Sequence, residues 1–262
     1  MPLIRRIMMA KYAGVDLSRW NGAVDFKKLK SGKILGSPVK FVMLRLGYGT
    51  KLDDRFRQYY TAAKSAGLHI GVYLYSIADT AEAARSEADW ALEQLKGLDI
   101  DYPVAFDFEH KAVLDKKLSK EQYTAICRAF LDRIHKGGFY PILYTAPVVI
   151  KGYLDLEKLS DYDLWLAQYT HSGTEQQYEQ TMWQFSVAGG VNDYNKVGKV
   201  PGVSGECDCN WSYVGYAAKI KRLGLNGKKQ VRLTAEVSVE ASKADKVAAE
   251  LKALGCTVKI ST

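Results

Sequence analysis

Two acidic residues lie one position apart at the end of an apolar stretch of the sequence. Residues 102–110 read YPVAFDFEH, with Asp107 and Glu109 directly after the apolar residues 104–106. On a strand, positions i and i+2 point to the same side, so both carboxylates would face one way, with their Cα atoms about 6–7 Å apart. Two carboxyl groups that close resist ionising together, so one tends to keep its proton. A protonated acid beside an ionised one is the arrangement that cleaves glycosidic bonds, whereas acids that cap a turn or pair with a cation are the structural alternative.

Further acids follow other stretches that we expect to be strands. Asp16 ends the stretch 11–16, and Asp208 ends the stretch 202–208. In a closed barrel of parallel strands, the chemistry lies at the carboxyl ends of the strands. The first and last strands of such a barrel are neighbours, so we expect Asp16 and Asp208 to converge.

Aromatic residues recur at the same expected strand ends. Rings above a groove with convergent carboxylates suit a sugar polymer, because the rings stack on apolar sugar faces while the acids bind hydroxyl groups. For any one ring the alternative is packing in the core, since aromatic residues pack well on strands. The residues are Tyr48, Tyr75, Tyr144, Tyr169 and Trp183.

Stretches typical of strands alternate with stretches typical of helices along most of the chain. Asp79 with Glu82, and Ser119 with Gln122, have the spacing of capping pairs that begin helices. The alternation predicts a parallel sheet with right-handed crossovers, and about eight strands in roughly 200 residues predict a barrel. The fold class is therefore α/β, an irregular (β/α) barrel, because the later strands lack full helices. Strands are expected at 11–16, 41–46, 69–75, 102–109, 139–144, 164–169, 181–185 and 202–208, and helices at 24–30, 53–66, 79–95, 119–136 and 211–223.

The end of the chain has a pattern of its own. Leu225–Gly227 reads as a linker or turn. Residues 231–239 and 256–260 alternate as half-buried strands do, and 242–254 has a helical pattern with one apolar face. A βαβ module this small needs a partner surface to be stable. The barrel, or a second copy of the chain in a homodimer, would supply it.

The net charge of +8 is unevenly distributed. From Ala218 to the end, ten Lys or Arg residues face four Asp or Glu, so this tail carries +6. A basic tail suits an anionic polymer, and the alternative is a soluble, lysine-rich surface.

The composition argues against several classes of protein. No apolar run approaches the roughly 20 residues of a membrane span, and the N-terminal residues 1–10 make a poor signal peptide. The four cysteines, at 127, 207, 209 and 256, show no CxxC spacing, and the histidines show no HxxxH spacing. We therefore expect reduced thiols, no metal and no cofactor. No recognised nucleic-acid motif is present.

An ordered set of motifs resembles glycoside hydrolase family 25, the Chalaropsis-type lysozymes. Gly14–Gly22 (GVDLSRWNG) with Val24–Phe26 looks like the opening of that family. The resemblance implies an irregular β/α barrel over 11–223 and no metal. It also implies N-acetylmuramidase activity, which cleaves the β-1,4 bond between N-acetylmuramic acid and N-acetylglucosamine in bacterial peptidoglycan. The matches cover about residues 11–216 and continue through 41–47, 71–76, 107–109, 140–145, 164–169, 183–185 and 208–210.

The resemblance also implies residue roles. Glu109 would be the proton donor to the leaving oxygen, and Asp107 would stabilise or orient the reacting sugar. The family is associated with retention of configuration, and either an enzyme carboxylate or the substrate's own acetamido group would attack. In the second case Asp107 would hold the acetamido group, an exception to the two-carboxylate scheme. Asp16 and Asp208 match further acids of the groove, and Arg45, Tyr48, Tyr75, Tyr144, Tyr169, Trp183 and Gln184 are the substrate-binding candidates.

Two other functions compete with a muramidase. A chitinase-like barrel hexosaminidase would have a further Asp two residues before the D-x-E pair, where this chain has Ala105. A catalytically silent glycan-binding barrel would not need the close pair of acids that this chain keeps.

The C-terminal module, residues 228–262, weakly resembles one repeat of sporulation-related wall-binding domains. The resemblance implies a wall-targeting module, as in phage endolysins that join a catalytic domain to a binder, with anionic wall polymers as partners. Because no leader is visible, we expect a lysin that is made in the cytoplasm and released to the wall, or an extracellular enzyme.

Overall fold

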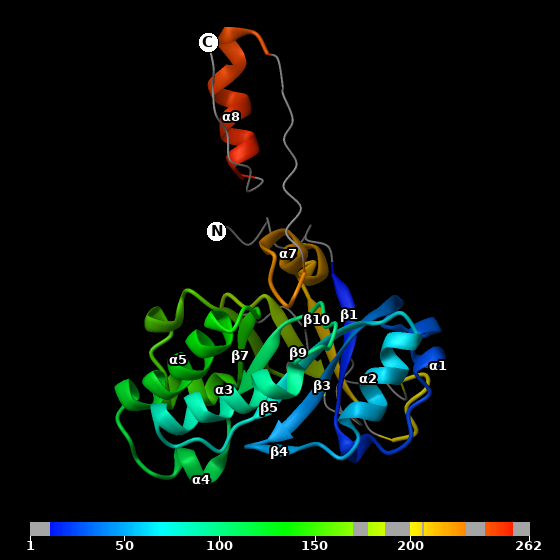
Figure 1. Ribbon diagram of the computed structural model, residues 1–262, viewed down its shortest axis with the longest axis vertical. Coiled ribbons are helices and arrows are strands. Elements are labelled where there is room, and N and C mark those ends of the chain that lie inside the picture. The colour runs from blue at the N-terminus through cyan, green and yellow to red at the C-terminus, as the bar shows by residue number, and fades with distance from the viewer. Residues whose placement is uncertain (1–10, 170–177, 187–199, 206, 229–238, 254–262) are drawn as a thin grey trace. The chain divides into compact units, whose positions relative to one another are not determined.

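The computed structural model describes residues 11–169, 178–186, 200–205, 207–228 and 239–253 (Figure 1). Contacts divide the chain into two units, Met1–Gln230 and Val231–Thr262. All strands found in the described ranges belong to the first unit. None of the helices in these ranges is both long and apolar enough to cross a membrane.

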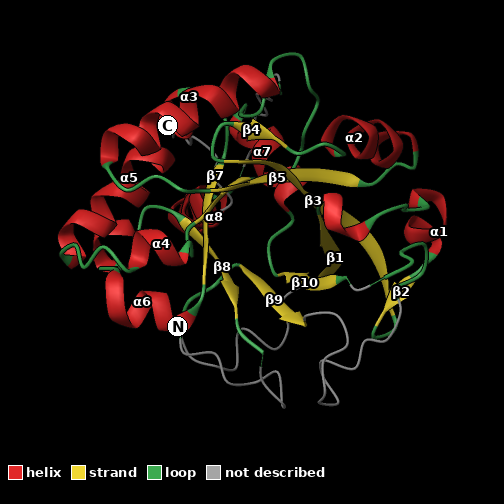
Figure 2. Cartoon of the chain, turned by 90° about the horizontal axis from the view of Figure 1, so that it is seen from below, coloured by secondary structure: helices red, strands yellow, loops and turns green. Residues whose placement is uncertain are grey.

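Eight strands of the first unit close into a barrel, with helices outside the ring of strands (Figure 2). The order is β1-β10-β9-β8-β7-β6-β5-β3, and pairing of β1 with β3 closes the ring. The predicted irregular barrel is thus confirmed. The strands are β1 (Tyr12–Leu17), β3 (Ser37–Tyr48), β5 (His69–Tyr75), β6 (Val104–Asp107), β7 (Pro141–Thr145), β8 (Asp163–Ala167), β9 (Met182–Ser186) and β10 (Asp208–Ser212), and the short β2 (Lys33–Ile34) and β4 (Lys51–Leu52) pair with β3.

The direction of β10 corrects one prediction. Asp208 begins this strand rather than ending it. The strand runs antiparallel to both β1 and β9. The register nevertheless pairs Asp208 with Asp16. The two acids therefore converge as expected, because an antiparallel strand brings its first residue to the rim where β1 has its last residues.

Helices cover the outside of the parallel part of the barrel. α3 and α5 pack against each other, and each has one apolar face, as expected for a helix that covers a sheet. After β8 the described residues contain no helix until α7, which accounts for the irregular shape. The helices of this unit are α1 (Phe26–Ser31), α2 (Phe56–Ser65), α3 (Ala81–Leu95), α4 (Lys111–Leu114), α5 (Lys120–Lys136), α6 (Pro147–Tyr153) and α7 (Tyr216–Leu223), with 3-10 turns η2 (Arg19–Asn21) and η3 (Glu157–Leu159).

Of the two N-caps predicted for the long helices, one is confirmed and the other is wrong. At α5 the predicted capping box of Ser119 and Gln122 is present. At α3 the N-cap is Thr80, whose Oγ1 accepts from the Ala83 amide at 3.1 Å, and not Asp79. Asp79 instead forms an ion pair with Lys116 across 37 residues of sequence, a contact that local spacing does not reveal.

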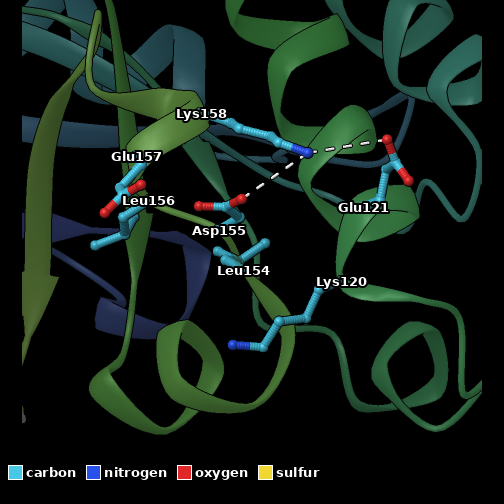
Figure 3. Close-up of a pocket in the computed structure, with 7 residues that line it drawn as sticks. All are labelled: Lys120, Glu121, Leu154, Asp155, Leu156, Glu157 and Lys158. Carbon is cyan, nitrogen blue, oxygen red and sulfur yellow. Dashed lines mark ion pairs between the residues drawn. The ribbon is translucent and has the colours of Figure 1, made fainter.

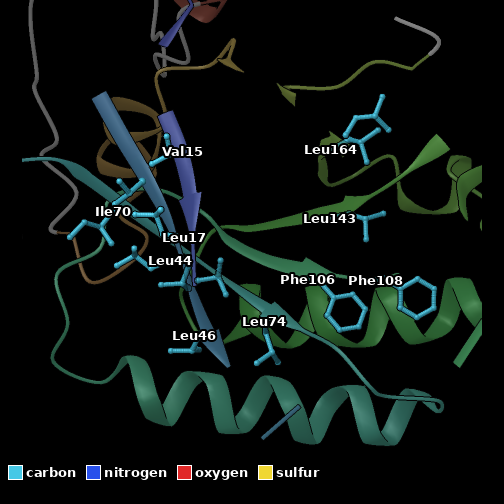
Figure 4. Close-up of a cluster of buried hydrophobic side chains, with 14 of the residues drawn as sticks. Val15, Leu17, Leu44, Leu46, Ile70, Leu74, Phe106, Phe108, Leu143 and Leu164 are labelled. Atoms are coloured by element: carbon cyan, nitrogen blue, oxygen red, sulfur yellow. The ribbon is translucent and has the colours of Figure 1, made fainter. Parts of the chain in front are cut away.

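Two apolar layers hold the barrel together. Strand residues that point outward, such as Leu44, Leu74 and Phe106, pack beneath the helices (Figure 4). Alternate residues point inward and form a second cluster that includes Phe41, Met43 and Trp165. Because side chains alternate along a strand, this division fixes which residues of each strand can reach the barrel interior.

One acid at the amino end of the barrel has three hydrogen-bond partners on one of its oxygens. Oδ2 of Asp163, the first residue of β8, accepts from the hydroxyls of Tyr140 at 2.6 Å and Tyr216 at 2.9 Å, and from Nζ of Lys219 at 2.9 Å. Tyr216 and Lys219 belong to α7, so this cluster fastens α7 to the amino end of the barrel.

The expected linker at Leu225–Gly227 is a turn of the barrel unit. The Asn226 side chain is buried and accepts from the amide of Tyr140 at 2.8 Å while donating to the carbonyl of Tyr102 at 2.9 Å. Lys228 pairs with Asp99 of the same unit. The chain therefore remains part of the barrel unit through Lys228.

The second unit contains the 3-10 turn η4 (Ala241–Lys243) and α8 (Ala244–Ala253). α8 lies within the expected helix at 242–254. Except for Val239, the strands expected at 231–239 and 256–260 lie outside the described residues. Of the 32 residues of this unit, five are Lys or Arg and four are Asp or Glu, so its net charge is +1.

Candidate active site

A pocket of about 190 Å³ opens where the carboxyl ends of the parallel strands meet β10. Four acids line it, from three places on the barrel: β1, the end of β6 and the start of β10. Arg45 is the single Lys or Arg among the lining residues. The lining consists of Asp16, Ser18, Trp20, Arg45, Tyr73, Tyr75, Asp107, Glu109, Tyr144, Trp165, Gln184 and Asp208.

Asp107 and Glu109 face the pocket together, as their i, i+2 spacing predicts. Phe108 between them points outward into the core. Asp107 is 3% exposed, and its Oδ1 has no hydrogen-bond partner among the described residues. Such an orphan buried oxygen costs folding free energy unless a ligand satisfies it.

Burial and mutual repulsion shift the titration of this pair. Burial, followed by the negative charges of Glu109 and Asp16, raises the pKa of Asp107 well above its usual value. Burial, followed by the charge of Asp16, raises the pKa of Glu109. Because both shifts favour the neutral form, the pair holds a proton at a pH where isolated carboxylic acids would be ionised.

Two buried amides hold Asp16 in one orientation. Its Oδ2 accepts from Nε2 of Gln184 at 2.9 Å and from Nδ2 of Asn210 at 2.8 Å. Burial raises the pKa of Asp16, and these two hydrogen bonds oppose that shift because they stabilise the carboxylate.

Aromatic donors fix the direction of both amides. The hydroxyls of Tyr144 and Tyr169 donate to Oε1 of Gln184 at 2.9 and 2.6 Å. Nε1 of Trp165 donates to Oδ1 of Asn210 at 2.8 Å. Since an indole N–H can only donate, the oxygen of Asn210 must face Trp165 and its NH₂ group must face Asp16.

Arg45 is anchored outside the group of four acids. Its Nε and Nη2 contact Oδ2 of Asp53 at 2.7 and 2.6 Å. The buried Asp53 also accepts from the backbone amides of Arg19 and Arg55. One carboxylate thus ties together β3, the turn after β1 and the start of α2, and holds the guanidinium of Arg45 at the wall of the pocket.

An aromatic cluster forms the wall beside Glu109. The rings of Tyr48 and Tyr75 stack with centroids 5.2 Å apart, and His110 meets both rings edge-on. Nδ1 of His110 lies 3.4 Å from the Tyr75 hydroxyl. Burial, with the charge of Glu109 next in effect, raises the pKa of Tyr75 to about 12, so its hydroxyl stays protonated and can donate.

The structure separates the eleven predicted site residues into three groups. Eight line the pocket: Asp16, Arg45, Tyr75, Asp107, Glu109, Tyr144, Gln184 and Asp208. Tyr48 and Tyr169 contact lining residues through the stacking and the hydrogen bond described above. Trp183 lies in the outer core, 2% exposed, with Nε1 donating to the carbonyl of Gln168 at 2.7 Å. This position argues against a substrate-binding role, because Gln184 points inward and its strand neighbour must point outward.

Several residues of the site did not stand out in the sequence. Tyr73 and Trp165 line the pocket, and Asn210 lies behind Asp16. Tyr73 and Asn210 each lie two positions from a predicted site residue on the same strand, so alternation would have found them. Trp165 pairs in register with Tyr144 on the neighbouring strand, which a single sequence does not reveal.

The cysteines beside Asp208 face away from the pocket. Cys207 and Cys209 are buried in the outer core, and both thiols are free. Burial, ahead of any neighbouring charge, raises the pKa of each thiol, so both stay protonated. A buried neutral thiol is a poor nucleophile. Cys256 lies outside the described residues.

A second hollow lies at the outer surface, between the start of α5 and the residues before η3 (Figure 3). Lys158 lies 3.9 Å from both Glu121 and Asp155 there. These charges are exposed and already paired with one another, so this hollow lacks the buried, poorly partnered acids of the barrel pocket.

A protein-family model matches most of the barrel. The model of "Glycosyl hydrolases family 25" matches residues 15–194. The matched span begins just before Asp16 and includes Asp107 and Glu109.

Three known proteins illustrate the similarity. An autolytic lysozyme of Clostridium acetobutylicum is 30% identical over 196 residues, which is 74% of this chain and 54% of that protein. This chain therefore spans about half the length of that relative. Among solved structures, the CTP1L endolysin superimposes with a TM-score of 0.63 at 28% identity, covering 81% of this chain and 70% of that one. A bacterial lysozyme from Streptomyces coelicolor gives a TM-score of 0.61 at 23% identity, covering 83% and 98%, and supports the fold.

Proposed function

The chain belongs to glycosyl hydrolases family 25, and from this premise we propose that its barrel pocket cleaves bacterial peptidoglycan as an N-acetylmuramidase. The bond cut is the β-1,4 bond between N-acetylmuramic acid and N-acetylglucosamine. The relatives support this choice, since they include an autolytic lysozyme and an endolysin. The single observation that carries the proposal is the close pair of Asp107 and Glu109 with raised pKa values in a pocket with two further acids.

Glu109 acts as the general acid. Its raised pKa favours the protonated carboxyl group, which can donate its proton to the leaving glycosidic oxygen while the bond from C1 to that oxygen breaks. Glu109 is then a carboxylate, and it takes a proton back from the water that later attacks C1. The enzyme therefore returns to its starting protonation state after each cut.

Asp107 holds the acetamido group of the reacting sugar. Its buried Oδ1 has no donor among the residues that the structure describes, and an acetamido N–H is a donor of the right kind. Accepting that hydrogen bond favours the ionised form of Asp107 and the attack of the acetamido oxygen on C1. The resulting cyclic intermediate opens when water adds, which gives retention of configuration.

The remaining residues of the pocket orient the sugar. Asp16 is fixed by Gln184 and Asn210. Asp208 lies beside it in register. Arg45 limits the repulsion among the acids, since its charge lowers the pKa of Asp107. The Tyr75 hydroxyl, next to Glu109, is a donor for a hydroxyl or carbonyl oxygen of the substrate.

The second unit is proposed as an accessory module that holds the enzyme at the cell wall, reached by release from the producing cell or by secretion. Its net charge of +1 gives no support to binding of anionic wall polymers. Five of the six excess charges of the tail lie in 218–230, where Lys219 pairs with Asp163 and Lys228 with Asp99. The residues that line the pocket lie within Met1–Gln230, so a chain ending at Gln230 should cut soluble glycan at the full rate. If the second unit holds the enzyme at the wall, the shortened chain should sediment less with intact walls, and equal sedimentation would contradict the module's role.

Product analysis tests the activity. Purified peptidoglycan is digested, the new reducing ends are reduced with borohydride, and the products are identified by mass spectrometry, with Glu109→Gln as the blank. We expect new ends on N-acetylmuramic acid that are absent with the variant. New ends on N-acetylglucosamine would move the activity to a chitinase-like cut, and no new ends on walls of several bacteria would favour a silent glycan-binding barrel.

A further inference from the structure

Trp20 is the most exposed large apolar side chain of the described residues, with 76% of its surface open to solvent. It is also one of the residues that line the acidic pocket. The other aromatic residues of the lining are much less exposed, since Tyr144 and Trp165 are 7% and 1% exposed and Tyr73 and Tyr75 are half-buried. Trp20 is therefore the one lining aromatic that presents most of its ring to the solvent at the rim.

The turn that carries Trp20 is held rigidly. In η2 the side chain of Ser18 accepts from backbone amides, and the Asn21 side chain accepts from the Ser18 amide at 2.8 Å, which forms a capping box. The Arg19 amide donates to the buried carboxylate of Asp53 at 3.1 Å. Asp53 also holds Arg45, so the turn and the pocket wall share one anchor.

One face of the Trp20 ring is already occupied. The guanidinium carbon of Arg19 lies over the ring, 4.6 Å from its centroid, and Nη1 of Arg19 pairs with Asp54 at 3.3 Å. A cation over one face both fixes the ring and leaves the opposite face available. Ligand sites combine aromatic surfaces with a few directed polar groups. The fixed indole ring, with one free face beside the polar pocket, fits this description.

The chemistry of the free face selects the ligand. A β-1,4-linked pyranose ring carries its large substituents in the plane of the ring, so its faces present mainly C–H groups. The negative face of an aromatic ring attracts such C–H groups, and the contact removes apolar surface from water on both sides.

We propose that the free face of Trp20 stacks on a pyranose ring of the glycan chain, at a position next to the sugar that is cut. The ligand is an uncut N-acetylhexosamine residue of the same chain, so the inference rests on the proposed function. Trp20 binds the polymer and takes no part in bond cleavage. Its contribution is equal in the ground state and the transition state, so its loss raises KM and leaves kcat unchanged.

Tryptophan fluorescence tests the stacking directly. Glu109→Gln, which binds without cutting, is titrated with a soluble tetrasaccharide of alternating N-acetylglucosamine and N-acetylmuramic acid. We expect a blue shift of the emission on binding that disappears in Glu109→Gln with Trp20→Phe, because the other lining tryptophan, Trp165, is already buried. The Phe variant keeps an aromatic face and should lose about two- to threefold in affinity, whereas Trp20→Ala should lose about tenfold.

Kinetics on the otherwise unmodified chain give the second readout. Trp20→Ala should raise KM for the soluble glycan about tenfold while kcat changes less than about twofold. Val148→Ala is the matched control, because Val148 is 71% exposed but is not one of the residues that line the pocket. It should change neither constant.

The outcomes separate this inference from the activity itself. If the unmodified chain cuts peptidoglycan while Trp20→Ala keeps both the affinity and the KM of its parent, the stacking platform is wrong and the proposed function stands. A fall in kcat without a change in KM would also overturn the platform. If the unmodified chain cuts no wall and Glu109→Gln binds no glycan, the proposed function fails and the platform fails with it.

Discussion

Asp163 and Asp107 lie at opposite ends of the same barrel, and their surroundings differ in kind. Asp163, at the amino end of β8, accepts from two tyrosine hydroxyls and a lysine. Asp107, at the carboxyl end of β6, has a buried oxygen with no hydrogen-bond partner in the described part of the chain, and a second acid lies two residues away. The amino end satisfies its charge and fastens α7, whereas the carboxyl end leaves charge unsatisfied where a substrate would bind.

The comparison teaches how this chain divides stability from chemistry. Groups that stabilise a fold have their partners in the protein, and groups that serve a reaction keep some of their bonding capacity for the substrate. A substitution at the carboxyl end should therefore lower the activity without lowering the stability. A substitution at the amino end should lower the stability without lowering the activity.

After Glu109→Gln, the largest effect is expected from Asp107→Asn, which removes the carboxylate proposed to hold the acetamido group. Loss of one preorganised group that stabilises the transition state costs about 10²–10³-fold in rate. Turbidity loss of bacterial walls at equal protein concentration measures it. Asp115→Asn, at an exposed residue paired with Lys111, should keep the full rate, and an equal loss in this control would break the comparison.

At the other end, Asp163→Asn should destabilise the barrel without touching the chemistry. It leaves Lys219 partly buried without its counter-charge, at a cost of about 1–3 kcal/mol in the free energy of unfolding. Urea unfolding measures the cost, and the rate of the folded fraction should be unchanged. Asp161→Asn provides the matched control, because Asp161 is an exposed surface partner of Arg128 and should cost less than about 1 kcal/mol.

Gln184→Ala should lower both the activity and the stability, because Gln184 supports the site and is itself buried. The change removes one donor from Asp16 and the shared acceptor of Tyr144 and Tyr169. We expect about tenfold slower cleavage together with about 1–2 kcal/mol lower stability. Gln58→Ala, at an exposed glutamine of α2, should do neither, and a purely structural Gln184 would leave the rate of the folded protein intact.

The smallest effect concerns stability against pH. Since burial raises the pKa of Asp107 above the usual 3.8, the unfolded chain releases this proton first as pH rises. Asp107 therefore lowers stability increasingly above pH 3.8 until its raised pKa is passed. Relative to its value at low pH, the Tm of Asp107→Asn should gain about 2–4 °C over the unmodified chain at neutral pH. A Tm difference that does not change with pH would contradict the raised pKa.

Local patterns were enough to predict much of the barrel and the core of the site. The alternation rule placed Asp107 and Glu109 on one side of a strand, and strand–helix alternation predicted the barrel. Asp208 was expected at the end of a strand and begins one, yet it meets Asp16, because the antiparallel direction of β10 brings its start to the same rim.

Contacts between distant residues account for what the sequence did not reveal. Asp53 holds Arg45 and the Trp20 turn, and Asn210 holds Asp16 across 194 positions. Trp183 and Gln184 could not both face the pocket, and only the observed register shows which one does. The sequence also did not reveal that two lysines of the basic tail, at 219 and 228, pair with acids of the barrel unit.

The most direct test of the central claim compares the unmodified chain with Glu109→Gln, measuring wall cleavage and Tm on the same samples. Glu121→Gln, at an exposed glutamate of the outer hollow, serves as the control. We expect cleavage to fall by about 10³-fold in Glu109→Gln, with a Tm equal to or above that of the unmodified chain because burial disfavours the Glu109 carboxylate. Cleavage that persists in Glu109→Gln, or that is lost only together with a lower Tm, would contradict the assignment of Glu109 as the general acid.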